Sequence, residues 1–245
     1  MLTDAPVPYR PVSRWTDRFP WITAGVTHRG TGNGSFDLRL FGDPVPPAAV
    51  RRWRALLAAT GFPGAVHARQ VHGTRIAVHA ALHEGLHAGN GPADGHATSA
   101  GGVLLGVTVA DCVPVYLVDP EHRAVALLHA GWKGTAAGIV EAGVRTLATR
   151  YGTRPADLHL HLGPAICGEC YEVGPEVFGA LGLPEPSGPE PVDLRAVLTG
   201  QARELGVPGG RISVSGACTL CGDGGYFSHR RGDSERQVAF LGIRP

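Results

Sequence analysis

The chain has 245 residues, of which 43% are hydrophobic, and its formal net charge is +1. This length allows one domain with a substantial core. The near-neutral charge excludes the broad basic surface that phosphate-driven nucleic-acid binding requires, so we expect a small-molecule site and no nucleic-acid partner.

Neither export nor membrane insertion is indicated by the sequence. The amino terminus, MLTDAPVPYRPVSRW, mixes acids, bases and prolines and lacks the apolar stretch of a secretory signal. The longest apolar run, residues 103–118, is interrupted by Asp111 and suits two buried strands better than a membrane helix. Five cysteines without an export signal are typical of thiols or metal ligands. We therefore predict a cytoplasmic protein with no membrane contact.

Apolar runs of β type occur along the whole chain. In chain order they cover residues 22–26, 65–71, 76–78, 103–109, 113–118, 124–129, 158–162, 212–214 and 238–243. Helical patterns cover residues 48–59, 135–150 and 193–205. Short turns between neighbouring strands, such as residues 119–122, favour antiparallel hairpins over a doubly wound parallel sheet.

These elements predict an α+β fold in which packed mixed or antiparallel sheets are flanked by helices. We expect a single domain over residues 1–245. The Pro- and Gly-rich stretch 182–191 is expected to be a surface loop rather than a linker.

Three strand ends each carry a soft or borderline metal ligand: His72 in RQVHG, Cys112 in VADC and His129 in LLHAGW. One thiolate and two imidazoles suit zinc, and three protein ligands leave one coordination position for water or substrate. Histidines are common in this chain, and a cysteine beside valine is usually a small core residue. The set therefore acquires meaning only if the fold brings the three strand ends together.

Two residues next to these ligands are further catalytic candidates beside Cys112. Asp111 is expected to point to the opposite side of an extended backbone from Cys112 and to transfer a proton or orient a ligand; the alternative is a turn cap. Lys133, the only lysine in the chain, begins a helix in GWKGTAAG, where backbone N–H groups favour an anion such as phosphate. The alternative for Lys133 is a solvated helix start.

A basic cluster in YFSHRRGD contains His229, Arg230 and Arg231. Paired arginines bind a phosphate or carboxylate through two hydrogen bonds, although surface arginines are more often solvated. The remaining cysteines form two CxxC pairs, CGEC at 167–170 and CTLC at 218–221. Their separation far exceeds that of a zinc ribbon, so we expect unpaired thiols near the pocket, with a structural zinc as the alternative.

Six segments, in this order, resemble the YfiH-like family: RQVHG, PADG at 92–95, VTVADCVPVYL, HAGWKGTAAGIV, GPAICGECYEVG and FSHRRGD. The family was once described as polyphenol oxidases or laccases, is also called peptidoglycan editing factor, and includes FAMIN-type purine nucleoside phosphorylases. The resemblance runs from about Thr27 to the carboxyl terminus, and the VADC and HAGW pair at this separation is highly specific. The chain is identified as a member on these motifs.

The resemblance implies four layers of packed sheets and flanking helices, with zinc held by His72, Cys112 and His129. It also implies phosphorolysis of adenosine, inosine and 5'-methylthioadenosine, and deamination of adenosine, so that the partners are a nucleoside and phosphate. A family role in editing peptidoglycan precursors is implied as well. On this basis we assign the following residues to substrate binding: Arg29, Gln70, Asp94, Lys133, His229, Arg230 and Arg231.

The chain departs from the family pattern at three positions near the expected pocket. Asp37 in SFDL stands where the family more often has an amide. His229 stands where tyrosine is frequent, and Glu235 where glycine is usual. These departures bear on the choice of substrate.

Cleavage of a purine N-glycosidic bond by phosphate requires an anion cradle, electrostatic support for an oxocarbenium-like sugar and a donor for the leaving base. Lys133, Arg230 and Arg231 are candidates for the cradle, and Asp111 is the candidate acid. Zinc would supply an activated water for deamination or bind a substrate atom, so one metal site would serve both reactions.

Three other functions compete with this hypothesis. In a cysteine hydrolase, Cys112 would be the nucleophile and His129 or His72 its base, which fits amide-bond editing of cell-wall precursors. A copper oxidase would need a weak axial ligand such as methionine, and the only methionine is Met1; we nevertheless expect copper to bind in vitro. The third is a non-catalytic metal- or nucleotide-binding module.

Overall fold

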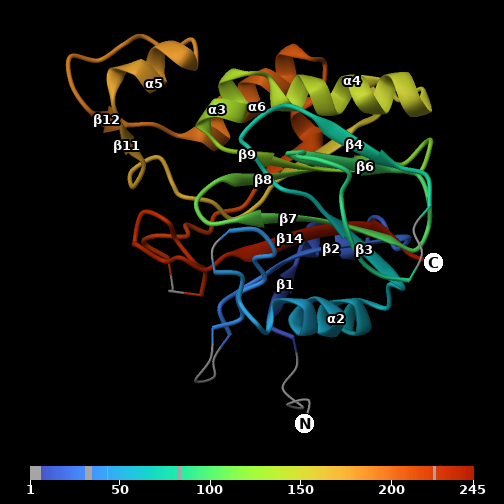
Figure 1. The fold of residues 1–245 in the computed structure, drawn as a ribbon. Coiled ribbons are helices and arrows are strands. Elements are labelled where there is room, and N and C mark those ends of the chain that lie inside the picture. The colour runs from blue at the N-terminus through green and yellow to red at the C-terminus, as the bar shows by residue number, and fades with distance from the viewer. Residues whose placement is uncertain (1–6, 31–34, 43, 82–83, 223–224) are drawn as a thin grey trace.

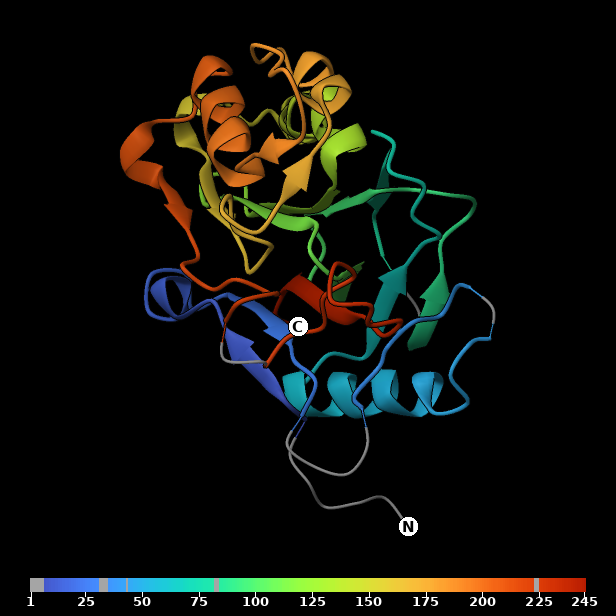
Figure 2. The same cartoon turned by 90° about the vertical axis from the view of Figure 1, so that its left-hand side faces the viewer.

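The computed structural model contains two six-stranded β-sheets that pack face to face between two layers of helices (Figures 1 and 2). It describes residues 7–30, 35–42, 44–81, 84–222 and 225–245. Residues 1–6, part of the amino-terminal segment that the sequence analysis expects not to be a secretory signal, lie outside the described residues. The four layers confirm the expected α+β fold.

The first sheet joins strands from both ends of the chain, in the spatial order β1, β2, β14, β7, β3, β5. Pairing is antiparallel from β1 to β7 and parallel from β7 to β5. The strands are β1 Tyr9–Pro11, β2 Ile22–Thr27, β3 Gly64–His67, β5 Gly85–Ala88, β7 Val103–Val109 and β14 Gln237–Ile243.

The second sheet has the spatial order β13, β10, β8, β9, β6, β4. Its centre is antiparallel, and each edge strand pairs in parallel with its neighbour. The strands are β4 Ile76–His79, β6 Gly95–Thr98, β8 Val113–Asp119, β9 Ala124–Ala130, β10 His159–Leu162 and β13 Ile212–Val214. The antiparallel hairpin of β8 and β9 confirms the turn predicted at residues 119–122.

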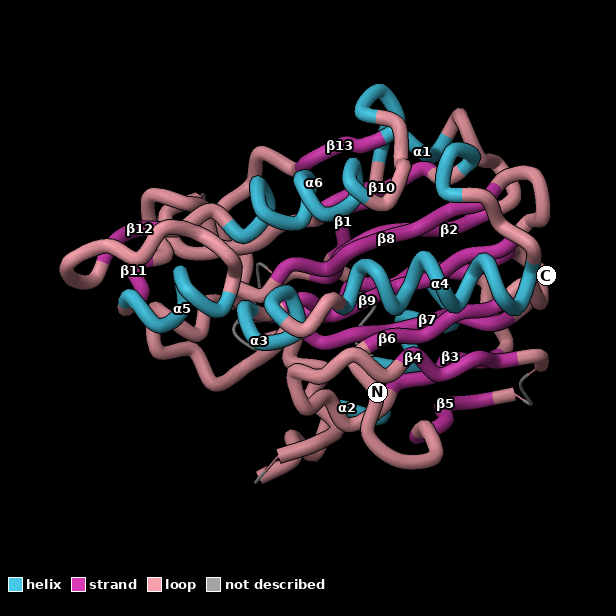
Figure 3. Tube along the Cα trace, turned by 90° about the horizontal axis from the view of Figure 1, so that it is seen from above, coloured by secondary structure: helices cyan, strands magenta, loops and turns pink. Residues whose placement is uncertain are grey.

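Helices cover the outer face of each sheet. The first sheet is covered by α2 Ala49–Thr60 (Figure 1), and the second by α3 Trp132–Ala136, α4 Ile139–Tyr151 and α6 Leu194–Glu204 (Figure 3). The smaller elements are α1 Ser13–Thr16, α5 Pro175–Ala180, the 3-10 turns Pro155–Asp157 and Gly209–Arg211, and the pair β11 Glu172–Val173 and β12 Glu190–Pro191. In the part of the chain that the structure describes, no helix has the length and apolar character to cross a membrane.

Burial explains why the central strands are almost continuously apolar. Every residue of β8 and β9 is buried, because the first sheet covers one face of these strands and helices cover the other. On the opposite side, Trp53 of α2 is fully buried and packs on β7 at Gly106. A Cβ at Gly106 would lie 2.5 Å from the Trp53 ring, so only glycine allows this contact.

Two predicted elements end differently in the structure. The single helix predicted over residues 135–150 is two helices, α3 and α4, because Gly138 has a left-handed backbone with φ of 82° before α4 begins. The strand predicted over residues 65–71 ends at His67. The N–H groups of residues 71–73 bond to the carboxylate of Asp94 instead of a neighbouring strand, so these residues form a loop.

Candidate metal centre and adjoining pockets

The three predicted metal ligands lie where the chain passes from the first sheet to the second. Cys112 lies in the short connection from β7 to β8, which belong to different sheets. His129 lies on β9, and the next residue, Ala130, pairs with Val113 of β8. His72 lies in the loop between β3 and β4. Cys112 and His129 are therefore at the same end of the second sheet, and the β3–β4 loop brings His72 to them.

One ligand atom from each of His72, Cys112 and His129 lies within 4.8 Å of the other two. Cys112 Sγ is 4.0 Å from His72 Nε2, and the centroids of the two imidazole rings are 4.9 Å apart. His129 is buried, Cys112 is half-buried and His72 is exposed. The cluster is therefore preassembled and open to solvent at His72.

Two residues of the cluster loops have a left-handed backbone that only glycine adopts without cost. His72 has φ of 59°, and Asp111, directly before Cys112, has φ of 82°. Such residues cost roughly 1–3 kcal/mol each and cluster at functional sites. Asp111 is therefore not extended, and the expectation that it faces away from Cys112 is wrong: both residues line the same pocket.

Asp94 is fully buried and fixes both histidine-bearing segments. Its Oδ1 accepts hydrogen bonds from His129 Nδ1 at 2.9 Å and from the His72 amide at 2.8 Å. Its Oδ2 accepts the amides of Val71 and Gly73 at 3.0 and 2.8 Å. A carboxylate on Nδ1 directs the Nε2 of a histidine toward a metal. Asp94, assigned to substrate binding from the resemblance, thus positions the ligands and lines neither of the pockets described below.

Gly131 provides the space that the ligand side chains occupy. A Cβ at this position would lie 2.8 Å from His72 Cδ2 and 3.0 Å from Cys112 Sγ. The backbone of Gly131 is ordinary, with φ of −82°, so its role is to allow close approach rather than to adopt an unusual conformation.

The electrostatics of the cluster favour a thiolate. Burial by itself would raise the pKa of Cys112, but His129 and His72 outweigh it and bring this pKa to about 6. Burial likewise opposes protonation of His129, yet Cys112 and Asp94 raise the pKa of His129 to about 9. A thiolate is the form of cysteine that binds a metal ion or attacks as a nucleophile.

Two pockets adjoin the cluster, and both are lined by His72 and Cys112. The first pocket has a volume of about 370 Å³ and is also lined by Asp111, Lys133, Tyr171, His229 and Arg230. The second pocket has a volume of about 460 Å³ and is also lined by Arg39, Phe41, Gln70, His229 and Arg236. Two of the three candidate metal ligands, His72 and Cys112, therefore line both pockets, and His129 lines the second pocket only.

Several predicted substrate residues line these pockets. The Lys133 ammonium lies 5.5 Å from the Trp132 ring centroid in the first pocket. Arg230 stacks on Tyr171 in the same pocket and donates a hydrogen bond from Nη1 to a backbone carbonyl. Gln70 lines the second pocket, where both ends of its amide bond to Thr108.

The Asp111 carboxylate is held firmly in the wall of the first pocket. Its Oδ1 accepts a hydrogen bond from the Thr219 hydroxyl at 2.6 Å, and its Oδ2 accepts the Arg230 amide at 2.7 Å. Asp111 is also 7% exposed. These contacts tie the residue before Cys112 to two loops near the carboxyl terminus.

Arg29 and Arg231 line neither pocket. Arg29 forms a 2.7 Å ion pair with Asp233. Arg231 donates from Nη2 to the carbonyls of Thr219 and Leu220 at 2.8 and 2.6 Å, and from Nη1 to Asp233. Both guanidinium groups therefore stabilise the loop that leads into β14. The sequence analysis had assigned the two arginines to substrate binding instead.

The sequence interpretation missed the cationic side of the second pocket, Arg39 and Arg236. Asp37 connects the two arginines: its Oδ2 pairs with Arg39 Nε at 2.9 Å, and its Oδ1 accepts the Arg236 amide at 3.1 Å. The departure noted at Asp37 was the available signal, because a buried acid requires a cation nearby. Trp132 and Tyr171, which line the first pocket, stood inside recognised motifs but were not assigned a role.

Fold and site together define a class of protein, the four-layer sheet sandwiches with a cluster of two histidines and one cysteine where the chain crosses between the sheets. In this chain the cluster is His72, Cys112 and His129, called the His₂Cys cluster below. The family model described as multi-copper polyphenol oxidoreductase laccase matches residues 26–244, and the chain belongs to this family.

Curated relatives carry two enzyme names. "Purine nucleoside phosphorylase YlmD" of Geobacillus stearothermophilus is 41% identical over 62% of this chain and 60% of the relative. "Purine nucleoside phosphorylase" of Deinococcus radiodurans is 38% identical over 82% of this chain and 79% of the relative. "Adenosine deaminase RL5" of an unknown prokaryotic organism is 34% identical over 71% of this chain and 72% of the relative.

Solved structures are similar over nearly the whole chain. The Bacillus licheniformis hypothetical protein YfiH has a TM-score of 0.87 at 28% identity and covers 98% of both chains. YlmD from Geobacillus stearothermophilus has a TM-score of 0.84 at 34% identity and covers 93% of both chains. The expected YfiH-like fold is thereby confirmed.

Proposed function

We propose that the chain is a zinc-dependent purine nucleoside phosphorylase, active on adenosine, inosine and 5'-methylthioadenosine, that also deaminates adenosine. The names of the relatives support both reactions. The observation that carries the proposal is the solvent-accessible cluster of His72, Cys112 and His129 between two pockets, one of which contains Lys133.

The donor set of the cluster fits Zn²⁺ with one open coordination position. It provides one thiolate and two imidazoles, the ligand types that zinc prefers, and the Asp94 carboxylate supports His129 from behind. A bound zinc ion supplies Lewis acidity and activates water at neutral pH. The exposed side of the cluster, at His72, gives substrate access to this position.

For phosphorolysis, phosphate adds to C1' of the sugar, the N-glycosidic bond breaks, and the base leaves with a proton. The other product is ribose 1-phosphate from adenosine or inosine, and 5-methylthioribose 1-phosphate from 5'-methylthioadenosine. Lys133 and Arg230 make the first pocket the site for the phosphate dianion. Among the residues that the structure describes, the Lys133 ammonium has no hydrogen-bond or ion-pair partner, so its charge is available to a ligand. The second pocket then accommodates the nucleoside, and His229, which lines both pockets, lies between the reactants.

Deamination differs from phosphorolysis because it consumes water, releases ammonia and requires no phosphate. Lys133→Ala should therefore raise the KM for phosphate about 10- to 100-fold, as expected for a lost charge-assisted contact, while adenosine deamination continues. Lys133→Arg is the matched control that keeps the positive charge. Product analysis of adenosine with and without phosphate checks both reactions.

Two results of this experiment would contradict the proposal. An equal loss of phosphorolysis and deamination in Lys133→Ala would show that Lys133 does not act specifically in phosphate binding. Binding of adenosine by the wild-type chain, loaded with zinc and given phosphate, without any turnover would identify a non-catalytic nucleotide-binding module.

A cysteine hydrolase is the second candidate, favoured by a different observation. Asp94, His129 and Cys112 follow one another as carboxylate, imidazole and thiol, and the pKa of the thiol is lowered to about 6. An acyl adduct on Cys112, detected by mass spectrometry after incubation with a peptidoglycan precursor, would support this function. Stoichiometric zinc on the purified chain would count against it.

The description of the family model, which names a multi-copper oxidoreductase, also suggests copper as a ligand of this chain. Among the described residues only two groups of potential ligands come together, the His₂Cys cluster and a cluster of four cysteines. The two histidines of β10, His159 and His161, belong to neither group. They pack against three aromatic residues in the core between the sheets: Phe19, Trp15 and Tyr116. The described residues therefore provide no imidazole-rich multicopper cluster, although copper is expected to bind the His₂Cys set in vitro.

A further inference from the structure

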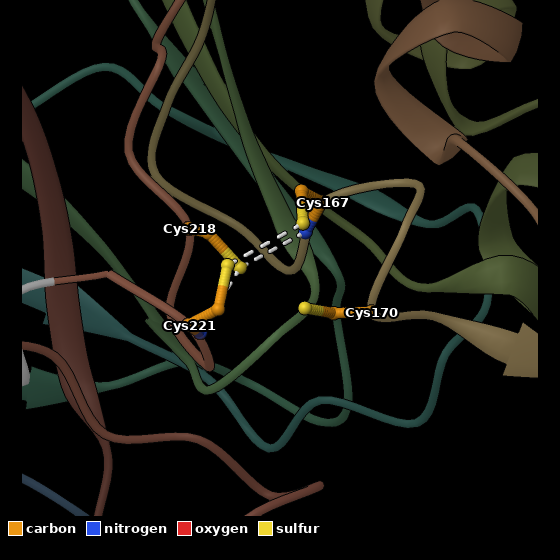
Figure 4. A group of neighbouring side chains, drawn as sticks. All are labelled: Cys167, Cys170, Cys218 and Cys221. Atoms are coloured by element: carbon orange, nitrogen blue, oxygen red, sulfur yellow. Dashed lines mark hydrogen bonds between the residues drawn. The ribbon is translucent and has the colours of Figure 1, made fainter.

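The second ligand group is formed by Cys167, Cys170, Cys218 and Cys221, whose sulfur atoms point toward a common centre (Figure 4). Two loops supply them: residues 163–171 after β10, and the loop that follows β13. Parallel pairing of β10 and β13 sends both loops out at the same end of the second sheet. A bridge between Ala165 and Cys218 continues this pairing beyond the strands.

The four sulfur atoms have the spacing of a tetrahedral metal site. All lie within 4.8 Å of one another, and those of Cys167 and Cys221 are 3.8 Å apart. Zinc–sulfur bonds of about 2.3 Å in a regular tetrahedron separate the sulfur atoms by about 3.8 Å. A disulfide would need about 2.05 Å, and all four cysteines are free thiols in the structure.

The backbone around the cysteines is shaped to support thiolates. Cys218 Sγ accepts the amide N–H groups of Cys167 at 3.3 Å and Cys221 at 3.5 Å. The first CxxC pair closes a turn in which the Cys170 amide donates to the Cys167 carbonyl. Gly222, directly after the second pair, has no space for a Cβ, which would collide with the Cys218 carbonyl oxygen.

We propose that Cys167, Cys170, Cys218 and Cys221 bind a structural Zn²⁺ ion, separate from the His₂Cys cluster. Binding converts the thiols into four thiolates, releases their protons to solvent, and leaves a site with no open position for substrate. The sequence separation of the two pairs, which argued against such a site, is spanned by the parallel β10–β13 pairing. This proposal does not depend on the reaction proposed above.

The ion would fasten one wall of the first pocket. Ile166 and Tyr171, which line the pocket, are adjacent in sequence to Cys167 and Cys170. Thr219, adjacent to Cys218, donates its hydroxyl to Asp111 and its amide to the Ala165 carbonyl. On the other loop, the Ile166 amide donates to the Asp111 carbonyl at 3.1 Å. The four cysteines therefore join two loops that each contact Asp111, the residue next to Cys112, and the metal has a positioning role.

The test counts metal on the full-length chain after reconstitution with excess Zn²⁺ and gel filtration. The proposal predicts one zinc ion that survives Cys112→Ala and is lost in Cys167→Ser/Cys221→Ser. X-ray absorption of Cys112→Ala should show sulfur neighbours alone at about 2.3 Å. The double serine variant should also melt at least about 5 °C lower, because metal binding contributes to folding. Cys112→Ala is the matched control, since it removes a thiolate from the other cluster.

Several outcomes would overturn the proposal. Cys112→Ala that is free of zinc, or a double serine variant that keeps the same zinc content as wild type, would contradict a four-cysteine zinc site. A Cys167–Cys221 disulfide in the unreduced wild-type chain would do so as well. Iron with acid-labile sulfide in place of zinc would assign the cluster to iron–sulfur chemistry instead. Should the double variant fail to fold, the zinc content and sulfur-only environment of Cys112→Ala still decide the question.

Discussion

The carboxylate of Asp94 accepts a hydrogen bond from His129 Nδ1 at 2.9 Å, with the same oxygen that accepts the His72 amide. One buried acid thus holds two candidate ligands from segments far apart in the sequence. Burial raises the pKa of Asp94, but the bonds from His129, Gly73 and Val71 outweigh it and keep this pKa below its usual range. The acid is therefore ionised where the cluster needs a fixed acceptor.

Asp94→Asn should weaken zinc binding at the His₂Cys cluster by about 10- to 100-fold, because the amide cannot accept all four hydrogen bonds. Competition with a chromophoric chelator measures the affinity. Asp119→Asn is the control, since Asp119 is equally buried and accepts bonds from His122 and Thr153 away from the cluster. Equal zinc affinity in both variants would remove the positioning role of Asp94.

Gly131→Ala should disturb the cluster although its backbone conformation suits alanine. The added Cβ would lie 2.8 Å from His72 Cδ2, so the imidazole or the loop must move, at a cost of about 1–3 kcal/mol in unfolding free energy. Chemical denaturation measures the loss of unfolding free energy. Zinc affinity, measured by chelator competition, should fall as well. Gly200→Ala, on α6 with open space around it, should instead stabilise by about 0.5–1 kcal/mol.

Cys112→Ala should abolish zinc binding at this cluster together with phosphorolysis and deamination, because both reactions are proposed to use one metal site. Metal analysis and nucleoside product analysis on the same preparation test the coupling. Phosphorolysis that persists in the variant without zinc at this cluster would separate the two reactions.

Acid should destabilise the chain in part through His161. Burial, followed by the charge of Arg14, lowers the pKa of His161 to about 4, although Ser213 opposes the shift. Below an unfolded pKa of 6.5, the unfolded chain binds a proton that the folded chain refuses. Stability is therefore expected to fall by on the order of 1–3 kcal/mol from pH 6.5 to 4 through this group.

His161→Gln should reduce that fall, because glutamine does not titrate and still bonds to the Ser213 hydroxyl. Urea unfolding at a series of pH values measures the difference. Above pH 7 the wild-type and variant curves should run parallel, which provides the internal reference. Identical slopes in the acid range would show that His161 is protonated in the folded chain.

Much of the fold could be predicted because the sequences of the buried strands are continuous apolar runs. The predictions over residues 103–109 and 113–118 nearly coincide with β7 and β8, whose side chains are buried on both faces. Short strands such as β5 and β6 were missed, since four residues carry too little periodicity. The break at Gly138 was missed because a helix-compatible composition surrounds it on both sides.

For the candidate site, too, some residues could be predicted from the sequence and others could not. Lys133 and Arg230 could be found from their motifs, and the structure places both in the first pocket. Arg29 and Arg231 look identical to pocket arginines in the sequence, but their partners are Asp233 and backbone carbonyls. Local sequence reports which groups are charged; it does not report which charges are already neutralised by a distant partner.

The sequence by itself identified His72, Cys112 and His129 as candidate ligands, because soft donors next to apolar runs are a local pattern. Only the tertiary structure decided that these three meet around Asp94, and that the four cysteines 167, 170, 218 and 221 gather around one centre. The physical reason is strand pairing: the crossing from β7 to β8 and the parallel contact of β10 with β13 bring together residues that no local signal connects.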